Sequence, residues 1–306
     1  MRGGRFDFSG YERAFERPGL GTDGAPGLSL KPDLPQSTDK LLGIDLTHII
    51  HTSEVATLNG SLASAKPGGG GGGTSFPNYT AGPTNASAGY NITIEFKGTG
   101  WTQAYYDIFK SAADNLTALI IGELPNVTVY GGKGGPKVVD DILITAELGA
   151  IDGLYGILGQ AGPTSVRSVG SLPATAQMKF DIADVNAMAL SVFSEVILHE
   201  MSHSLGFGSI WGRLGLVSNG EFTGANAAAE FHQMGGTGFI PVEQDGGSGT
   251  AGSHWDEETF HNELMTGYIN DGVNPFSEMS AASFADLGYK LAAAYPSWVS
   301  SGDFFV

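Results

Sequence analysis

The pattern of apolar and polar positions predicts a folded body that begins near Tyr90. From there Ile92, Ile94 and Phe96 alternate with polar residues, which is the period of a strand with one buried face. Further strands are expected at three segments, which are 127–129, 142–146 and 178–180. The first half of the body is therefore expected to form a sheet.

Two segments show helical periodicity. Trp101 to Ile121 is amphipathic, and Gly122 is expected to cap its C-terminus. A longer helix is expected from about Val185 to Leu205, with Gly206 just beyond its end. Its buried face follows the i, i+3, i+4, i+7 pattern and consists of Val185, Met188, Ala189, Val192, Phe193 and Val196.

The C-terminal part is expected to be rich in loops. No element of ten residues is indicated between Gly208 and Ser253, and a last helix near Ser280 to Leu287 stops at Gly288. Strands followed by helices among long loops predict an α+β domain with one mixed sheet.

Composition divides the chain into three parts. Residues 1–85 are rich in Gly, Pro, Ser and Asp and include the glycine run 68–73, which is typical of a flexible linker. They are predicted to form a tail or pro-segment with a short strand near 41–50. Residues 86–295 are the predicted domain, and 296–306 a C-terminal tail.

Charge and cysteine content limit the function. The net charge of −17, from 32 acidic and 15 basic residues, disfavours nucleic acid and anionic membranes as partners. The chain has no cysteine, which excludes disulfides and fits a cytosolic protein or an exported bacterial one. The first twenty residues lack an apolar core and no apolar run reaches 18 residues, so neither a cleaved signal peptide nor a transmembrane helix is expected.

The candidate chemistry lies at the end of the long helix. Its buried face leads to His199 and His203, one turn apart, so both imidazoles can reach one ion. Glu200 follows His199 and lies one residue further round the helix, so it can reach a water bound to that ion. The string His-Glu-Met-Ser-His at 199–203 is a zincin motif. The alternative is a chance match on a core helix, but each buried histidine left unsatisfied would cost about 1–3 kcal/mol.

A catalytic zinc site needs histidine ligands, a bound water and a general base. Neutral imidazoles bind zinc at about 2.0–2.1 Å, a third protein ligand completes the set, and the metal lowers the pKa of a water to about 7. Glu200 can take the proton of that water during attack on a peptide carbonyl and pass it to the departing amine. The motif therefore predicts a zinc hydrolase acting on protein or peptide substrates.

The sequence after the motif resembles one branch of the metzincins. Gly206, three residues after the second histidine, is typical of metzincins, but Ser209 stands where they usually have a third histidine. The strings Gly252-Ser253-His254-Trp255-Asp256 and Glu263-Leu264-Met265-Thr266-Gly267 resemble the leishmanolysin family, which carries a long insertion before that histidine. Residues 285–289 look like the last helix of the family.

The resemblance, which spans roughly residues 90–291, implies a metzincin-type zincin fold. This fold has a mixed twisted sheet, a backing helix, an active-site helix and a loop-rich C-terminal subdomain. The resemblance also implies that His254 is the third zinc ligand, that Met265 is the Met-turn residue and that the protein is a zinc endopeptidase. Protozoan leishmanolysins are rich in cysteine, so a cysteine-free chain suggests a bacterial relative. Residues 303–306 resemble the C-termini of exported bacterial metalloproteases, so a secreted enzyme is expected.

A calcium site is a weaker expectation. Residues 152–156 resemble a calcium-binding loop of matrixin-type metzincins, and Asp152, Asp181 and Asp184 can supply carboxylate oxygens. A glycine turn followed by a helix N-terminus explains the same aspartates without an ion.

Two rival functions and three rival third ligands remain open. A different zincin class would use a downstream acid such as Glu221 as third ligand, although Gly206 and the Met265 string disfavour it. A zincin fold without activity would serve as an adhesin or binding module, but a structural site has no need of Glu200. His232 and His261 are the other candidate third histidines.

Overall fold

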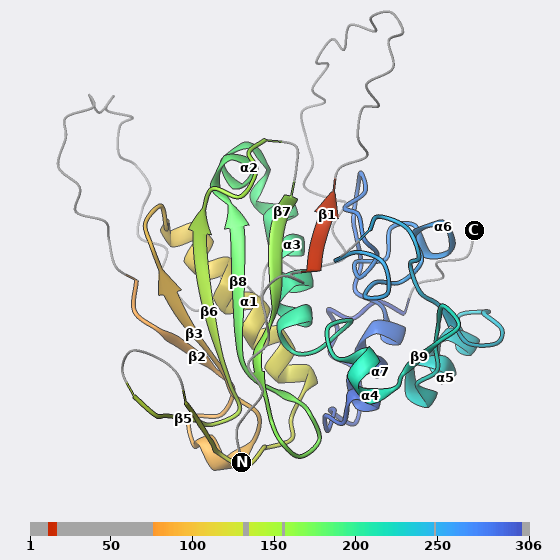
Figure 1. Ribbon diagram of the computed structural model, residues 1–306, viewed down its shortest axis with the longest axis horizontal. Coiled ribbons are helices and arrows are strands. Elements are labelled where there is room, and N and C mark those ends of the chain that lie inside the picture. Colours follow the sequence, from red (N-terminus) through yellow and green to blue (C-terminus); the bar gives the residue numbers. More distant parts are fainter. Residues whose placement is uncertain (1–11, 17–75, 131–134, 155–156, 248, 302–306) are drawn as a thin grey trace, which may run out of the picture.

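The computed structural model describes residues 12–16, 76–130, 135–154, 157–247 and 249–301 (Figure 1). The strand expected near 41–50, the glycine run and residues 303–306 lie outside these ranges. Within the described part of the chain, no helix combines the length and the apolarity needed to cross a membrane.

A six-stranded mixed sheet forms one layer of the domain, in the order β1-β7-β8-β6-β3-β2. The central strands β3 (Ile92–Lys97), β6 (Ile142–Gly149) and β8 (Pro173–Asp181) run parallel. The outer strands are antiparallel to their neighbours and are β2 (Tyr79–Ala81), β7 (Ile157–Val166) and β1 (Glu12–Glu16). The prediction of an α+β domain with one main mixed sheet is confirmed, as are its strands at 92, 142 and 178.

Two features of the strands differ from the pattern. β4 (Val127–Val129) exists where predicted, but it pairs with β5 (Lys137–Val139) in a separate two-stranded sheet. β7 was not indicated, because Gly159, Gly162 and Pro163 interrupt its alternation. The division of the chain at residue 86 remains a prediction, although β2 lies before that point and belongs to the sheet.

The first helix, α1 (Gln103–Leu119), begins at Thr102, whose side chain accepts a hydrogen bond from the Tyr105 N–H. The prediction that Gly122 caps this helix is wrong, because the chain leaves the helix already at Ile120 in an extended conformation. Ile120 forms a bridge to Leu291, and the Gly122 N–H donates to the Lys290 carbonyl. A Cβ at Gly122 would lie 2.5 Å from the Lys290 Cβ, so the glycine permits this close crossing.

The expected long helix is two helices. α2 (Ile182–Ala187) and α3 (Leu190–Ser204) are separated by Met188 and Ala189, both in extended conformation. The break turns the chain from the end of β8 back along the sheet, so the predicted apolar stripe is not continuous: Ala189 is exposed. α3 ends as predicted, with Gly206 in a left-handed conformation (φ 112°) after the cap.

The C-terminal part consists of short elements joined by loops. They are α4 (Trp211–Leu214), β9 (Val217–Ser218), β10 (Glu221–Phe222), α5 (Ala225–Gln233), β11 (Ile240–Pro241), α6 (Glu257–Phe260) and α7 (Glu278–Leu287). Outside this part, a 3-10 turn, η3 (Ala86–Ala88), lies between β2 and β3. None of the elements described between residues 208 and 253 reaches ten residues, which agrees with the prediction. α7 ends at Gly288 (φ 110°) as predicted.

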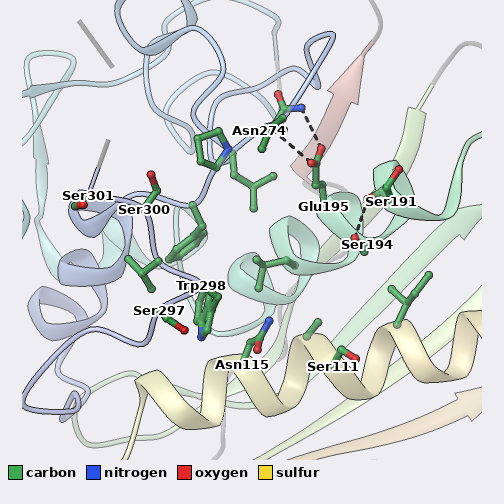
Figure 2. A pocket seen from close by; sticks show the side chains of 18 residues that line it. Ser111, Asn115, Ser191, Ser194, Glu195, Asn274, Ser297, Trp298, Ser300 and Ser301 are labelled. Atoms are coloured by element: carbon green, nitrogen blue, oxygen red, sulfur yellow. Dashed lines mark hydrogen bonds between the residues drawn. The ribbon is translucent and has the colours of Figure 1, made fainter. Parts of the chain in front are cut away.

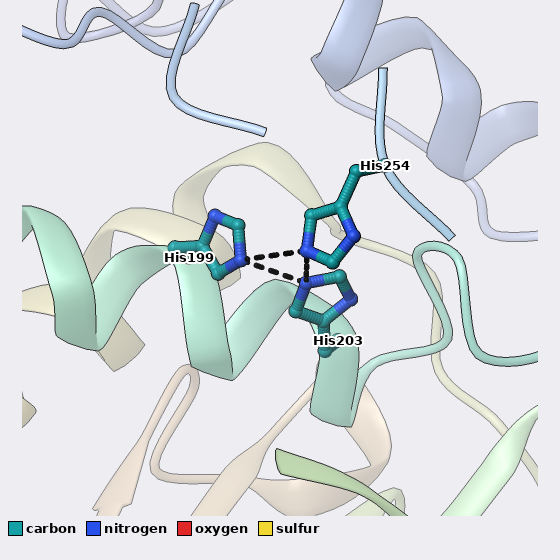
Figure 3. Close-up of side chains that lie close together, drawn as sticks. All are labelled: His199, His203 and His254. Atoms are coloured by element: carbon teal, nitrogen blue, oxygen red, sulfur yellow. Dashed lines mark hydrogen bonds between the residues drawn. The ribbon is translucent and has the colours of Figure 1, made fainter. Parts of the chain in front are cut away.

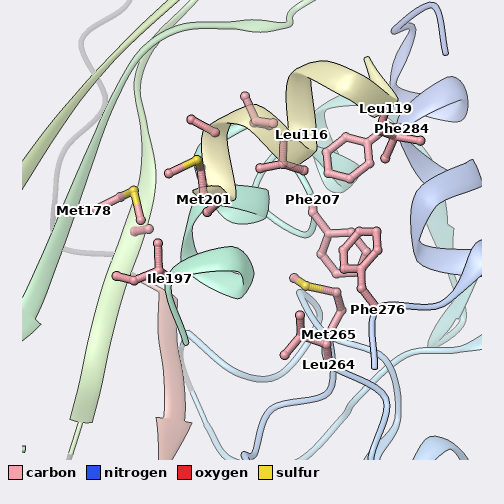
Figure 4. Packing of buried hydrophobic residues seen from close by; sticks show 14 of the residues in the cluster. Leu116, Leu119, Met178, Ile197, Met201, Phe207, Leu264, Met265, Phe276 and Phe284 are labelled. Atoms are coloured by element: carbon pink, nitrogen blue, oxygen red, sulfur yellow. The ribbon is translucent and has the colours of Figure 1, made fainter. Parts of the chain in front are cut away.

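The core holds α3 between the sheet and the C-terminal part (Figures 1 and 4). Met178 of β8, Ile197 and Met201 of α3 and Leu116 of α1 are fully buried in one cluster with residues of the C-terminal part. Burial of such side chains contributes about 1.5–3 kcal/mol each. α3 is therefore fixed from both sides, and its last turns face the C-terminal loops.

Candidate metal centre

Three histidines meet at the end of α3, as Figure 3 shows. The His203 Nε2 lies 2.8 Å from the His199 Nε2 and 3.0 Å from the His254 Nε2, and the remaining pair is 3.2 Å apart. All three side chains are fully buried. The structure thus brings together the three histidines that the sequence and its resemblance single out.

Local backbone geometry explains how His254 reaches the helix. His199 and His203 lie one turn apart on α3, and the chain then turns through Gly206 and Gly208. A Cβ at Gly208 would lie 2.1 Å from the Ser253 carbonyl oxygen. The absence of a side chain at Gly208, together with its positive φ of 66°, therefore allows the segment before His254 to pack directly against this turn.

The outer nitrogens of the three rings fix their tautomers. The Nδ1 atoms of His199, His203 and His254 lie 2.8, 3.0 and 3.0 Å from the carbonyl oxygens of Leu264, Phe207 and Thr250. A carbonyl oxygen only accepts hydrogen bonds, so each Nδ1 carries the proton and each Nε2 of a neutral ring presents a lone pair. Three lone pairs then face one another, which is unfavourable unless a cation lies among them.

The environment keeps these rings neutral. Burial, together with the neighbouring histidines, lowers the pKa of His199 and of His254 well below the usual value. Burial lowers the pKa of His203 to about 4. At neutral pH all three therefore offer nitrogen lone pairs rather than positive charge.

The donor set fits zinc. Ligands at about 2.0–2.1 Å in a tetrahedral site stand roughly 3.3 Å from one another, and the nitrogens here are 2.8–3.2 Å apart. Imidazole donors suit zinc and related transition metals, whereas calcium and magnesium require oxygen. The carbonyls behind the Nδ1 atoms are the outer partners that orient such ligands.

Glu200 follows His199 on α3 and is fully buried. Its carboxylate lies against the backbone of β7, because a Cβ at Gly159 would be only 2.7 Å from the Glu200 Oε1. The unpredicted strand β7 therefore forms a wall of the candidate site, and Gly159 leaves space for the carboxylate.

Met265 lies in a turn that supports His199. It is fully buried, and the preceding residue, Leu264, supplies the carbonyl for the His199 Nδ1. Glu263, also fully buried, accepts hydrogen bonds from the Met265 N–H and from the Ser277 and Ser280 hydroxyls. Burial raises the pKa of Glu263. No local sequence pattern indicates this supporting role of Glu263, because Ser277 and Ser280 lie 14 and 17 residues downstream.

The rival ligands lie elsewhere. His232 is exposed on α5, where its Nε2 lies 2.8 Å from the Gly238 carbonyl oxygen. His261 is exposed just after α6. Glu221 is exposed on β10. None of the three belongs to the three-histidine cluster.

The structure does not support the calcium prediction. Asp181 caps α2 through the Ala183 N–H, and its Oδ2 accepts from the N–H groups of Ile151, Asp152 and Gly153. Asp152 bonds the Ile157 N–H. The aspartates 152, 181 and 184 form no candidate metal cluster among the described residues. The interpretation as a turn and a helix cap explains Asp181 without an ion.

We expect Asp181→Ala to lower the free energy of unfolding by about 2–4 kcal/mol, since four backbone donors lose their acceptor. Millimolar calcium should leave the melting temperature of the wild-type protein unchanged. Burial alone raises the pKa of Asp181, but the donors of Gly153, Ile151, Ala183 and Asp152 bring it below the usual value. Its contribution is therefore present above pH 4 and is lost as the pH falls through the lowered pKa.

Thermal unfolding with and without calcium, and urea unfolding from pH 7 to pH 3, measure these effects. Asp152→Ala is the control, because Asp152 is exposed and bonds one N–H group. A calcium-dependent rise in melting temperature that Asp181→Ala removes would contradict this interpretation.

A mixed α+β domain with three buried, converging imidazoles defines a candidate metalloprotein. Residues 163–296 match the family model described as leishmanolysin, a peptidase family. The chain is 28% identical over 151 residues to a leishmanolysin homolog of Crithidia fasciculata, and 28% identical over 132 residues to leishmanolysin of Leishmania donovani. These matches cover 44% and 38% of this chain. The chain is therefore leishmanolysin-like.

The match is partial in both directions. Each of these alignments covers 22% of the relative, so the chain spans less than a quarter of the length of the curated proteins it matches. The family suggests a metallopeptidase. The bacterial origin expected from the absence of cysteine stays a prediction.

Proposed function

We propose that this protein is a zinc-dependent endopeptidase with Glu200 as general base. One observation carries the proposal: three Nε2 lone pairs converge within 3.2 Å, on rings whose Nδ1 atoms are bonded to carbonyls. A nitrogen site of this kind fits zinc. The leishmanolysin match supports peptide bonds as the substrate.

Each residue has a distinct role in the proposal. His199, His203 and His254 would hold the metal. Zinc, when bound, supplies a Lewis acid that lowers the pKa of a water and polarises a carbonyl. Glu200 would hold the proton of the attacking water on a carboxylate oxygen and then release it to the departing amine. The wall formed by Gly159 and β7 would limit where the carboxylate can move.

The finer features of the fold are part of the same proposal. α3 would be the active-site helix of a metzincin, α1 its backing helix and Met265 its Met-turn residue. The location of Met265, next to the carbonyl that bonds His199, supports this assignment. Protein or peptide substrates and secretion from the cell follow from the same interpretation.

A binding module without activity is the second candidate. A structural zinc site needs only its ligands and no general base. The fully buried Glu200 beside the histidines therefore favours an enzyme.

We expect hydrolysis of casein or gelatin to cease after dialysis against a chelator and to return with one equivalent of zinc per chain. The reason is that the neutral histidines would serve as metal ligands, and without the metal nothing in the site would lower the pKa of the attacking water. Metal content and rate are measured on the same samples. Hydrolysis that persists in metal-free protein would contradict the proposal.

A further inference from the structure

The fully buried carboxylate of Glu263 binds the N-terminus of α7. Its Oε1 accepts hydrogen bonds from the Ser277 N–H at 3.0 Å, from the Ser277 hydroxyl at 2.7 Å and from the Ser280 hydroxyl. Its Oε2 accepts from the Met265 N–H. Ser277 is the N-cap residue of α7, so the carboxylate also lies at the positive end of the helix dipole.

The directions of these hydrogen bonds indicate that Glu263 is ionised. The Ser277 hydroxyl accepts from the Ser280 N–H, and the Ser280 hydroxyl accepts from the Trp255 Nε1–H. Amide and indole nitrogens can only donate, so each hydroxyl can direct its own hydrogen at Glu263. A carboxylate, which has about four lone-pair positions, satisfies all of these donors at once.

The first link from Glu263 runs to His199. Leu264 follows Glu263 directly, and its carbonyl oxygen lies 2.8 Å from the His199 Nδ1. The turn is held from both sides of that carbonyl, because the Leu264 N–H donates to the Pro275 carbonyl and the Met265 N–H donates to Glu263. Glu263 therefore helps to set the position of the carbonyl that orients the His199 ring.

The second link runs to His254. Trp255 follows His254 and is fully buried, and its Nε1–H donates at 2.8 Å to the Ser280 hydroxyl that in turn donates to Glu263. The Trp255 N–H also donates to the Met265 carbonyl at 3.0 Å. The residue after His254 is thus fixed, through its backbone and its indole ring, to the same turn that supports the first ligand.

We propose that Glu263 is a positioning residue, whose carboxylate aligns His199 and His254 for one metal ion. The inference rests on the proposed zinc site and adds to it a residue outside the ligand set. The two ligands come from different parts of the fold, one from α3 and one from the loop before α6. A shared anchor behind both therefore limits how far their Nε2 atoms can move apart.

The test replaces Glu263 by glutamine, which keeps the shape of the side chain but has an NH₂ group in place of one acceptor oxygen. On either side of the carboxylate, that group would face hydrogen-bond donors. We expect Glu263→Gln to bind zinc about 10–100-fold more weakly, the range for loss of an outer partner of a ligand. Competition with a chromogenic chelator measures the affinity, and near-ultraviolet circular dichroism shows that the variant is folded.

A spectroscopic measurement distinguishes positioning from a general loss of stability. The d–d absorption bands of cobalt(II) bound in place of zinc respond to ligand geometry. Glu263→Gln should shift these bands in folded, cobalt-loaded protein. Ser280→Ala removes the hydroxyl between Trp255 and Glu263 but keeps the bond from the Met265 N–H. It should shift the bands less, and it decides the case in which Glu263→Gln does not fold.

Glu195→Gln is the matched control. Glu195 is a second buried glutamate, 7% exposed, one turn before His199 on α3. Figure 2 shows it beside Asn274 in the wall of a cavity of about 420 Å³. It accepts a hydrogen bond of 3.0 Å from the Asn274 Nδ2, and a glutamine oxygen can keep this bond. Zinc affinity should stay within about twofold of that of the wild type, with an unchanged cobalt spectrum.

The outcomes separate this proposal from the proposed function. A folded Glu263→Gln protein with the zinc affinity and the cobalt spectrum of the wild type would overturn the positioning role, as would an equal effect of Glu195→Gln. If Glu263→Gln does not fold, an unchanged Ser280→Ala spectrum would overturn it. None of these readouts requires peptide hydrolysis, so the positioning role can fail while the peptidase function stands. Wild-type protein that binds neither zinc nor cobalt would instead refute the metal site itself.

Discussion

Glu200→Ala is expected to reduce kcat/KM for peptide hydrolysis by about 10²- to 10⁴-fold, the range of a general base, while one zinc ion per chain remains bound. The two effects separate because Glu200 lies next to the three-histidine cluster but outside it. Its carboxylate contacts the β7 wall at Gly159. Hydrolysis of one fluorogenic peptide and metal content of the dialysed protein are measured together.

The companion variant Glu200→Gln keeps the shape of the side chain and removes its capacity to hold a proton. It should lose activity to a similar degree, which distinguishes loss of a base from loss of packing. A Glu200→Ala protein that cleaves peptides at a rate close to that of the wild type would contradict the assignment. Simultaneous loss of zinc would show instead that Glu200 supports the metal site.

The fold was predictable where local periodicity and burial agree. β3, with Ile92 and Ile94 fully buried, and α7, with its glycine cap, follow directly from the residue pattern. The break between α2 and α3 was not predictable from the residue pattern, because methionine and alanine, the residue types at 188 and 189, both favour a helix. β7 was missed because it contains glycines, which are depleted in strands; a Cβ at Gly159 would lie 2.7 Å from the Glu200 Oε1, a contact that only the structure shows.

The candidate site likewise combines features that local sequence predicts with features that depend on contacts distant in the sequence. The spacing of His199 and His203 is a local signal, since helix geometry alone places both on one face. The histidine Nδ1 atoms bond backbone carbonyls of Leu264, Phe207 and Thr250. Every residue type has such a carbonyl, so these contacts cannot be predicted from the residue types. Glu195 and Asn274 are 79 residues apart, so their contact and the cavity beside them required the structure.

The largest change in metal content is expected from His254→Ala. His199 and His203 come from one helix, and a catalytic zinc site needs a third protein ligand from elsewhere in the fold. His254 is the histidine that the structure brings to them, with its Nε2 at 3.0 and 3.2 Å from theirs. Loss of an outer partner of a ligand costs about 10–100-fold in metal affinity, and loss of the ligand itself should cost more.

His254→Ala should therefore lose zinc on dialysis and lose activity with it. Zinc content, peptide hydrolysis and the near-ultraviolet circular dichroism of the dialysed proteins are compared, the last to show that the variant is folded. His232→Ala and His261→Ala are matched controls, because both residues are exposed and lie outside the cluster. They should retain metal and rate. A folded His254→Ala protein that keeps its zinc, or a His261→Ala protein that loses it, would show that another residue completes the site.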